Sequence, residues 1–321
     1  MSAPQSLIES LCQKNVKLAR YSSWLVGGSA DLFIEPVDLK SLAEIFSAAN
    51  ATQTPVSILG GGTNVLISDQ GVRGLVISLR RLTGISLDKT EVQSQATVTA
   101  AAAGGSTASP TLTFWALAGT PKSEILKYFL KVKSSAALFL AGLPGQVGGG
   151  VVMNAGVSEK LTPREFCEII EAVEVLRPDG TLEIIDSQKI KWGYRHCEGW
   201  RPGIITRVKI SYPDHPDEKI LQEVKKLNQL RLQKQPLELP SCGSVFVNPP
   251  GLSAGRLIEE AGLKGRQVGG AQISVKHGNF IVNKGEATAG DIQALMDICV
   301  QTVREKFKID LRSEVIWLGE K

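Results

Sequence analysis

Two glycine-rich clusters constrain this chain more than any other feature of its sequence. The first, Gly60-Gly61-Gly62-Thr63-Asn64, follows a short apolar run, and the second lies within residues 141–156 and includes Asn154. Glycine lets the backbone approach a phosphate closely and present its N–H groups. Neither cluster has the third glycine of G-x-G-x-x-G or ends in Gly-Lys-Ser/Thr, so both common nucleotide-binding patterns fail. The glycines serve either turns and strand packing or a pyrophosphate, and two clusters with asparagines favour the pyrophosphate.

Length and charge limit the remaining possibilities. The chain has 321 residues, 36 basic and 32 acidic ones, largely interspersed, which predicts two or three packed units and no nucleic-acid surface. Five scattered cysteines form no Cys-x-x-Cys or zinc pattern, and they fit a reducing compartment. The first 20 residues lack a signal peptide's apolar core, and the longest apolar stretch, 136–143, is too short to span a bilayer. We therefore expect a cytoplasmic protein with no obligate protein partner.

Periodicity predicts three mixed units, at 1–80, 81–213 and 214–321. In the first unit we expect a helix capped by Asp38 and strands at 55–59, 65–68 and 75–79. In the second we expect a strand at 98–103, helices at 111–118 and 123–132, and a hairpin joining 170–177 to 181–185. In the third we expect helices at 216–235, 254–261 and 292–307, and strands at 243–248, near Ile273 and Phe280, and at 314–318.

Three ordered motifs carry a resemblance to a known family: Trp24-Leu-Val-Gly-Gly28, the run 58–67, and 142–149 followed by Met153-Asn-Ala-Gly156. The chain resembles the UDP-N-acetylenolpyruvoylglucosamine reductases over nearly its whole length. That implies an α+β fold of the vanillyl-alcohol-oxidase type, with two α+β subdomains around FAD and a C-terminal α+β substrate domain. The implied FAD contacts are Gly60, Gly61, Gly62, Thr63, Asn64, Gly145, Gly148, Gly149, Asn154 and Gly156. Related oxidases often attach flavin through an upstream histidine, and no histidine precedes the first cluster, so noncovalent FAD is expected.

The Tyr194-Arg195 pair matches the family's Tyr-Arg motif, which implies that Tyr194 contacts the substrate and Arg195 binds and polarises its enolpyruvyl carboxylate. A guanidinium suits that task because it offers a fixed, always charged fork. A surface salt bridge is the ordinary alternative for any single arginine. Cys197, close by, departs from the family, which commonly has a smaller hydroxyl or an acid there.

Two further motifs follow in the C-terminal third. The run 243–249 resembles a family loop in which Ser244 donates a proton to the substrate carbon and Asn248 contacts the diphosphate. Glu314, in the closing 311–319 segment, would share stabilisation of the intermediate with Arg195. The ordinary alternatives are a serine that caps a backbone group and a solvent-facing glutamate. Val247 stands where the family usually has lysine, and His277 is expected to be structural.

The resemblance implies an FAD-dependent oxidoreductase that passes hydride from NADPH to UDP-N-acetylglucosamine enolpyruvate and yields UDP-N-acetylmuramate. This step belongs to peptidoglycan precursor synthesis, and hence to cell wall formation, cell shape and division. Arg195 and Ser244 are 49 positions apart, which resembles the shorter form of the family, without a substrate-capping insertion. A flavin oxidase on the same fold and a flavin- or nucleotide-binding protein without catalysis remain as alternatives.

Overall fold

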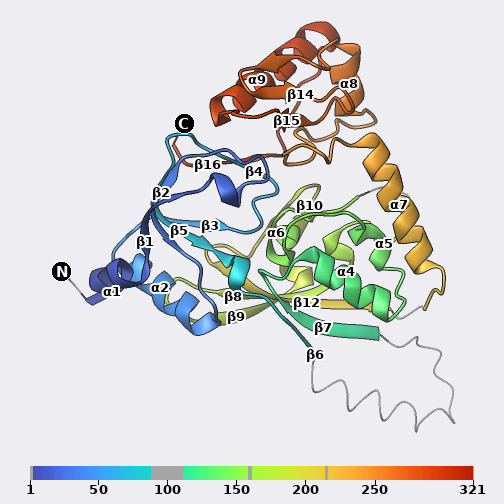
Figure 1. Ribbon diagram of the computed structural model, residues 1–321. Coiled ribbons are helices and arrows are strands. Elements are labelled where there is room, and N and C mark those ends of the chain that lie inside the picture. The colour runs from blue at the N-terminus through green and yellow to red at the C-terminus, as the bar shows by residue number, and fades with distance from the viewer. Residues whose placement is uncertain (1–2, 88–110, 158–160, 214–215, 321) are drawn as a thin grey trace, which may run out of the picture. The chain divides into compact units, whose positions relative to one another are not determined.

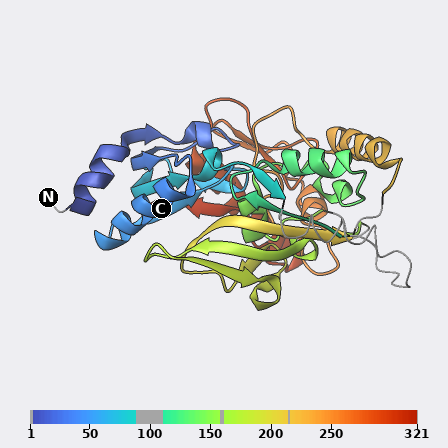
Figure 2. The same ribbon diagram turned by 90° about the horizontal axis from the view of Figure 1, so that it is seen from below.

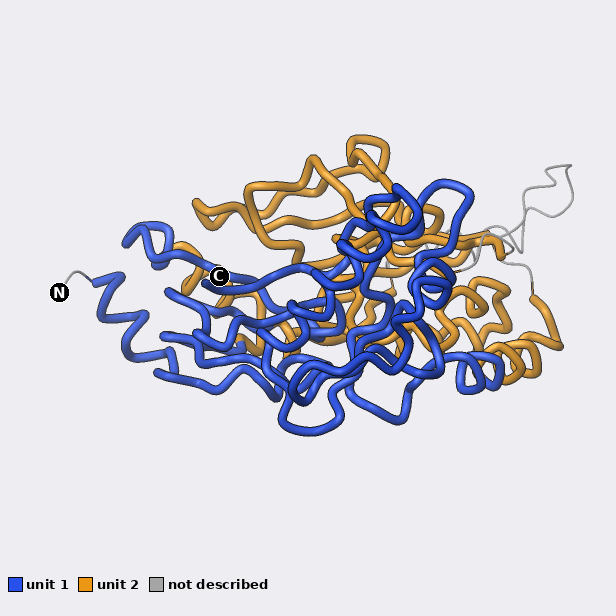
Figure 3. Tube along the Cα trace, turned by 90° about the horizontal axis from the view of Figure 1, so that it is seen from above, with its two compact units in different colours: residues 1–35, 48–78, 229–321 blue, residues 36–47, 79–228 orange. Residues whose placement is uncertain are grey.

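The structure is a computed structural model that describes residues 3–87, 111–157, 161–213 and 216–320. Internal contacts divide the chain into two compact units, coloured separately in Figure 3. Unit 1 comprises Met1–Glu35, Ala48–Ser78 and Gln229–Lys321, and unit 2 comprises Pro36–Ser47 and Leu79–Asn228. The three-domain division at 80 and 213 stays a prediction. Among the described residues, no helix is both long and apolar enough to cross a membrane.

A four-stranded sheet forms the N-terminal part of unit 1, in the order β1-β2-β5-β3. Its strands are β1 (Gln13–Lys17), β2 (Ser29–Ile34), β5 (Val72–Ser78) and β3 (Val56–Leu59). Strand β5 runs parallel to both β2 and β3, and its Val72 and Val76 are buried together with Phe33 and Leu59. The expected strands at 55–59 and 75–79 are confirmed within a few residues.

The last strand of the chain joins unit 1 beside the first glycine cluster. Strand β16 (Ile316–Leu318) pairs in parallel with β4 (Val65–Ile67), which begins directly after Asn64. Segments about 250 residues apart in sequence therefore lie side by side. Both strands were expected at these places, and the pairing between them is what the structure adds.

The C-terminal part of unit 1 packs two helices with a three-stranded sheet, as Figure 1 shows. These elements are α8 (Ala254–Glu260), β13 (Gln267–Val268), β14 (Ala271–Ile273), β15 (Ile281–Asn283) and α9 (Ala289–Phe307). Helix α9 starts with a capping box between Thr288 and Asp291, and its apolar stripe lies in the core. Both expected helices are confirmed.

The expected strand at 243–248 is wrong. Among the described residues this segment forms one isolated antiparallel bridge, between Phe246 and Ser313. The Asn279 carboxamide accepts a hydrogen bond from the Phe246 N–H at 2.9 Å and donates one to its carbonyl at 2.7 Å. This side chain therefore takes the place of a second neighbouring strand, which no alternation of apolar residues reveals.

A five-stranded antiparallel sheet forms the centre of unit 2, in the order β6-β7-β12-β8-β9. Its strands are β6 (Ile85–Leu87), β7 (Thr111–Leu117), β12 (Ile204–Pro213), β8 (Ile170–Leu176) and β9 (Leu182–Asp186). Figure 2 shows β12 in yellow beside β8 and β9 in yellow-green. The hairpin between β8 and β9 is confirmed, with Gly180 at φ 89° in its turn.

The expected helix at 111–118 is wrong, because this segment is strand β7. Phe114 and Ala116 are fully buried while their neighbours are only partly so, an alternation of period two. The threonines and aromatic residues of this segment also favour a strand. The expected strand at 98–103 lies outside the described residues.

Three helices in unit 2 carry the second glycine cluster and its neighbours: α4 (Lys122–Lys131), α5 (Ala137–Leu140) and α6 (Val147–Val152). Helix α4 packs against α5, and α6 contacts β7 and β12. Outside these groups lie the helices α1 (Ala3–Leu11), α2 (Leu39–Ala51) and α7 (Ile220–Lys234), and the small hairpin of β10 (Lys191–Gly193) and β11 (His196–Glu198). Short 3-10 turns occur at Ala19–Tyr21, Leu79–Arg81, Phe166–Glu168 and Ser187–Lys189. The expected helices at 123–132 and 216–235 are confirmed as α4 and α7.

Candidate active site

The first glycine loop, residues 60–64, connects β3 to β4 in unit 1. A Cβ on Gly62, which has φ +67°, would lie 1.8 Å from the carbonyl oxygen of Tyr21, so only glycine fits there. Within the described residues, the backbone N–H groups of Gly60, Gly62 and Thr63 donate no hydrogen bond. Unused N–H groups of this kind suit an anion such as a phosphate.

The second glycine loop lies in unit 2 against the segment 118–122. The Lys122 N–H donates to the Gly145 carbonyl at 3.0 Å, and the Val147 N–H donates to Thr120 at 2.9 Å. In the described part of the chain, the N–H groups of Gly145, Gln146 and Gly149 have no acceptor. A Cβ on Gly149 would meet nothing within 4 Å, so this glycine borders open space. Each loop by itself therefore offers backbone N–H groups suited to a phosphate.

Asn154 and Gly156, also expected to touch the cofactor, are engaged inside the protein. The buried Asn154 amide nitrogen donates to a Glu165 carboxylate oxygen at 3.0 Å and to the Gly193 carbonyl at 3.1 Å. Its oxygen accepts from the Cys167 N–H at 3.0 Å. Both amide hydrogens are thus used. These bonds position Glu165 and the β10 strand end that precedes Arg195.

Arg195 stands in the turn between β10 and β11 with φ 64°, a left-handed conformation that is uncommon for a residue with a side chain. Its Nη2 donates to the Gly156 carbonyl at 3.1 Å, and its Nη1 lies 3.8 Å from Glu165 Oε1. Its guanidinium also lies over the Tyr194 ring, 4.7 Å from the centroid. The side chain is 14% exposed. The surface-pair alternative therefore fails, and Arg195 is a partly buried, oriented cation.

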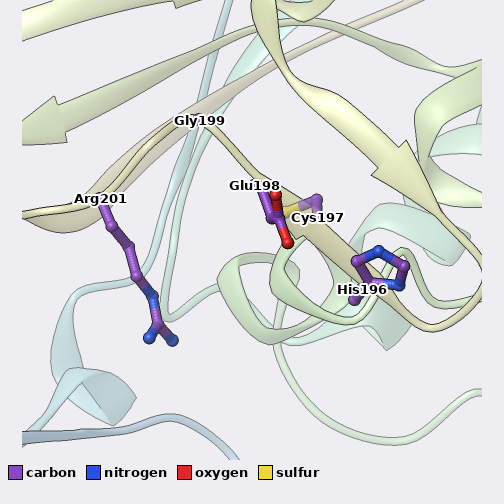
Figure 4. Close-up of a pocket in the computed structure, with 5 residues that line it drawn as sticks. All are labelled: His196, Cys197, Glu198, Gly199 and Arg201. Atoms are coloured by element: carbon purple, nitrogen blue, oxygen red, sulfur yellow. The ribbon is translucent and has the colours of Figure 1, made fainter.

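A cavity of about 370 Å³ lies along strand β11 and the residues after it, the segment that follows Arg195 in the sequence. It is lined by five residues of this segment, drawn in Figure 4: His196, Cys197, Glu198, Gly199 and Arg201. Burial raises the pKa of the Cys197 thiol to about 11, so this residue is a neutral thiol at physiological pH.

Ser244 is partly buried in unit 1 and precedes the segment held by Asn279. The Val245 N–H donates to the Asn279 carbonyl at 2.9 Å, and Gly243, at φ +78°, has open space where a Cβ would point. The Cys242 sulfur lies 3.6 Å from the carbonyl oxygens of Gly62 and Val65. The serine segment and the first glycine loop are therefore neighbours within unit 1.

Glu314 lies beside the serine segment. Its N–H donates to the Val245 carbonyl at 2.8 Å, and its own carbonyl accepts from Asn64 Nδ2 at 2.9 Å. The structure thus brings Ser244, Glu314 and Asn64 together. Asn248 uses its side-chain oxygen to accept from the Ala254 N–H at 3.0 Å, at the start of α8, and its side chain is turned toward that helix.

Three residues that sequence reasoning missed take part in these arrangements. Asn279 supports Ser244, Glu165 supports Arg195, and Lys122 is a buried lysine whose pKa is lowered by burial and by the charge of Arg195. The sequence carried a signal only for Lys122, because a lysine at the first position of a helix is electrostatically unfavourable. The other two are defined by tertiary contacts.

Comparisons with known protein families show what this chain is similar to. Residues 30–186 match the family described as FAD binding domain. Residues 235–318 match the C-terminal domain of UDP-N-acetylenolpyruvoylglucosamine reductase. With its two phosphate-suited glycine loops, the chain is an FAD-dependent oxidoreductase.

Curated relatives define the family. A UDP-N-acetylenolpyruvoylglucosamine reductase of Caldanaerobacter subterraneus is 35% identical over 311 residues, which cover 96% of this chain and 93% of that protein. That of Listeria welshimeri is 36% identical over 307 residues, covering 95% of each. The chain belongs to the UDP-N-acetylenolpyruvoylglucosamine reductase family.

A solved structure supports the same fold. The reductase from Thermus caldophilus matches with a TM-score of 0.75 and 32% sequence identity, over 96% of this chain and all of that one. The expected α+β FAD-binding fold is therefore confirmed.

Proposed function

We propose that Arg195, Ser244 and Glu314 carry the chemistry of this family in this chain, the reduction of UDP-N-acetylglucosamine enolpyruvate to UDP-N-acetylmuramate for peptidoglycan synthesis. FAD, when bound, supplies the hydride carrier between NADPH and the enolpyruvyl double bond. In the described part of the chain, six backbone N–H groups of the loops at 60–63 and 145–149 donate no hydrogen bond, which supports binding of its phosphates. Side chains cannot carry hydride, so the protein's own part is to bind, polarise and protonate.

One observation carries the proposal most directly. The hydrogen bond from the Glu314 N–H to the Val245 carbonyl, at 2.8 Å, makes the backbone of Glu314 a neighbour of the residue that follows Ser244. A neutral hydroxyl is a weak acid, and it donates a proton effectively only to a strongly basic carbon held beside it. Ser244 would supply that proton, and Glu314 would stabilise the charged intermediate by hydrogen bonding.

Arg195 would bind the enolpyruvyl carboxylate and polarise it as negative charge develops. Its orientation supports this role, because Gly156 and Tyr194 hold the guanidinium in one direction before any ligand arrives. Glu165 lies 3.8 Å from the guanidinium and would keep its position without sharing in the reaction.

The remaining contacts stay predictions. Tyr194, 43% exposed, would contact the substrate, and Asn248 its diphosphate. Because both amide hydrogens of Asn154 are used inside the protein, its contribution to FAD would come from its backbone or its oxygen. The cytoplasmic location expected from the sequence also stays a prediction.

An anaerobic experiment tests the function. The purified protein should be yellow, acid precipitation should release its FAD, and NADPH should bleach it without air. UDP-N-acetylglucosamine enolpyruvate should then restore the yellow colour and form UDP-N-acetylmuramate. Rapid colour return with oxygen but not with this substrate would favour the flavin oxidase alternative. No bleaching by NADPH would favour a flavin-binding protein without catalysis.

A further inference from the structure

Lys122 is a buried lysine at the edge of the second glycine loop. It is the first residue of α4, and only 5% of the residue is exposed. Its Nζ lies 5.7 Å from the centroid of the Phe166 ring, and its backbone N–H donates to the Gly145 carbonyl. Its backbone is thus fixed to the same loop that presents the unused N–H groups of Gly145 and Gln146.

The surroundings of Lys122 have an excess of positive charge. Burial lowers its pKa to about 8, and the Arg195 guanidinium lowers it as well. Within the described residues, no carboxylate raises the pKa of Lys122. Glu165, 3.8 Å from Arg195, is a negative partner of that arginine and not of Lys122, and Cys167 and Cys197 hold neutral thiols because burial raises their pKa values. The positive end of the α4 helix dipole adds to the same imbalance.

A second, independent observation also points to a ligand. The side-chain oxygen of Gln146 is buried and has no hydrogen-bond partner among the described residues, and the residue is 8% exposed. Gln146 lies opposite Pro121, the neighbour of Lys122, in an isolated backbone bridge. Buried polar atoms are normally satisfied. A ligand that brings both an oxyanion and a hydrogen-bond donor would satisfy this lysine and this glutamine.

We propose that Lys122 is a second oxyanion-binding side chain of unit 2, in addition to Arg195, and that it binds an oxyanion of a bound ligand. Two sources share that chemistry, a phosphate of FAD and the carboxylate of the enolpyruvyl substrate. The proposal rests on the proposed function for the identity of these ligands. A purely structural role is disfavoured, because a buried, uncompensated ammonium destabilises a fold that an apolar side chain of similar length would stabilise.

The test compares Lys122→Met with Lys127→Met, which removes the same charge from an exposed position of the same helix. FAD affinity is measured on the apoprotein by quenching of flavin fluorescence, and substrate affinity on the oxidised holoprotein by the change in flavin absorbance. Lys122→Met should weaken either FAD affinity or substrate affinity roughly 10- to 100-fold, the loss expected for a hydrogen bond to a charged group. Weakened FAD binding identifies the phosphate, and weakened substrate binding with normal FAD binding identifies the carboxylate.

The wild-type protein supplies a readout that needs no substitution. An oxyanion raises the pKa of a lysine that it contacts, so binding at pH 8.5 should take up a proton. Calorimetry in two buffers of different ionisation enthalpy measures this uptake for FAD and for the substrate. Lys122→Met should abolish it, and Lys122→Arg should retain affinity up to higher pH because arginine stays charged.

The proposal is overturned if neither ligand binds with proton uptake, or if Lys122→Met binds both ligands within twofold of Lys127→Met. In these cases wild-type reduction of the enolpyruvyl substrate still supports the proposed function. Failure of the proposed function looks different, because the wild-type protein itself then neither binds nor reduces that substrate.

Discussion

The side chain of Asn64 donates a hydrogen bond of 2.9 Å to the carbonyl oxygen of Glu314, a residue 250 positions later in the chain. The Asn64 carbonyl in turn accepts from the Ile316 N–H at 3.0 Å. One asparagine at the end of the first glycine loop therefore fixes the start of the closing strand. Two hydrogen bonds within unit 1 therefore connect the loop expected to hold phosphate with the segment that carries Glu314, the residue expected to assist the chemistry.

Asn64→Asp tests the hydrogen bond from Asn64 to the Glu314 carbonyl. The change keeps the shape of the side chain but places a carboxylate oxygen where an amide donor faced that carbonyl. We expect the ligand-free protein to lose roughly 1–3 kcal/mol of unfolding free energy, the usual cost of a hydrogen bond broken at a partly buried site. Thermal or denaturant unfolding measures it. Asn50→Asp, at an exposed position near the end of α2, is the control for added charge. Equal stability of the two variants would show that the Asn64 bond contributes nothing.

Local patterns predicted the elements whose burial follows one period. Helix α9 carries its apolar stripe through the core, and the hairpin around Gly180 has the expected turn, so both were predictable. The segment 111–117 was assigned to the wrong class because its residues also fit a helical spacing. Its alternation of burial becomes visible only when β6 and β12 pair on either side.

The site was predictable only in part. Motifs indicated Arg195, Ser244 and Glu314, yet nothing in the sequence indicates that Asn279 binds both backbone groups of Phe246 or that Glu165 stands beside Arg195. Such pairs join residues far apart in sequence, and a single asparagine or glutamate has no distinctive local pattern. A motif can also indicate a residue whose side chain is used elsewhere. Asn154 was expected to contact the cofactor, but both of its amide hydrogens form hydrogen bonds inside the protein.

Arg195→Lys tests the guanidinium. A lysine keeps the charge but cannot reach the Gly156 carbonyl and a carboxylate with one planar fork. We expect reduction of the enolpyruvyl substrate to fall roughly 10²- to 10³-fold, as for loss of one preorganised donor to a developing charge, while NADPH still bleaches the flavin. Arg164→Lys, in an exposed pair with Glu168, is the matched control. Turnover equal to that of the control would remove Arg195 from the reaction.

Lys122 also predicts how stability depends on pH. Its pKa, lowered by burial to about 8 in the folded protein, lies below its value in the unfolded chain, so the unfolded chain binds the proton more tightly. At neutral pH this group therefore destabilises the ligand-free fold, and the penalty disappears as pH rises from about 8 through the unfolded-state pKa.

At pH 7, ligand-free Lys122→Met should accordingly be more stable than wild type, by up to roughly 3 kcal/mol of unfolding free energy. It should therefore unfold at a higher temperature. The difference in stability between Lys122→Met and wild type should narrow steadily above pH 8. Lys127→Met should be as stable as wild type across the same pH range. Melting curves from pH 6.5 to 10 measure it. A variant less stable than wild type at pH 7 would contradict an uncompensated buried charge at this position.

Ser244 gives the sharpest separation of the two half-reactions, because hydride transfer from NADPH to flavin requires no proton for the sugar nucleotide. Ser244→Ala should therefore be bleached by NADPH at close to the wild-type rate. The return of electrons to the enolpyruvyl substrate should slow by roughly 10²- to 10⁴-fold, the range for loss of a general acid. Ser244→Cys should retain more activity than the alanine variant, because a thiol can donate a proton.

The neighbouring serine supplies the control for this experiment. Ser241→Ala removes a hydroxyl three positions earlier in the same segment, so it reports any disturbance of the backbone that Asn279 and Cys242 hold in place. Anaerobic rapid-mixing absorbance separates bleaching from colour return in all four proteins. Slow bleaching in Ser244→Ala would indicate a disturbed flavin site instead of a lost acid. Colour return with substrate as fast as in Ser241→Ala would show that another group delivers the proton, and the role assigned to Ser244 would be wrong.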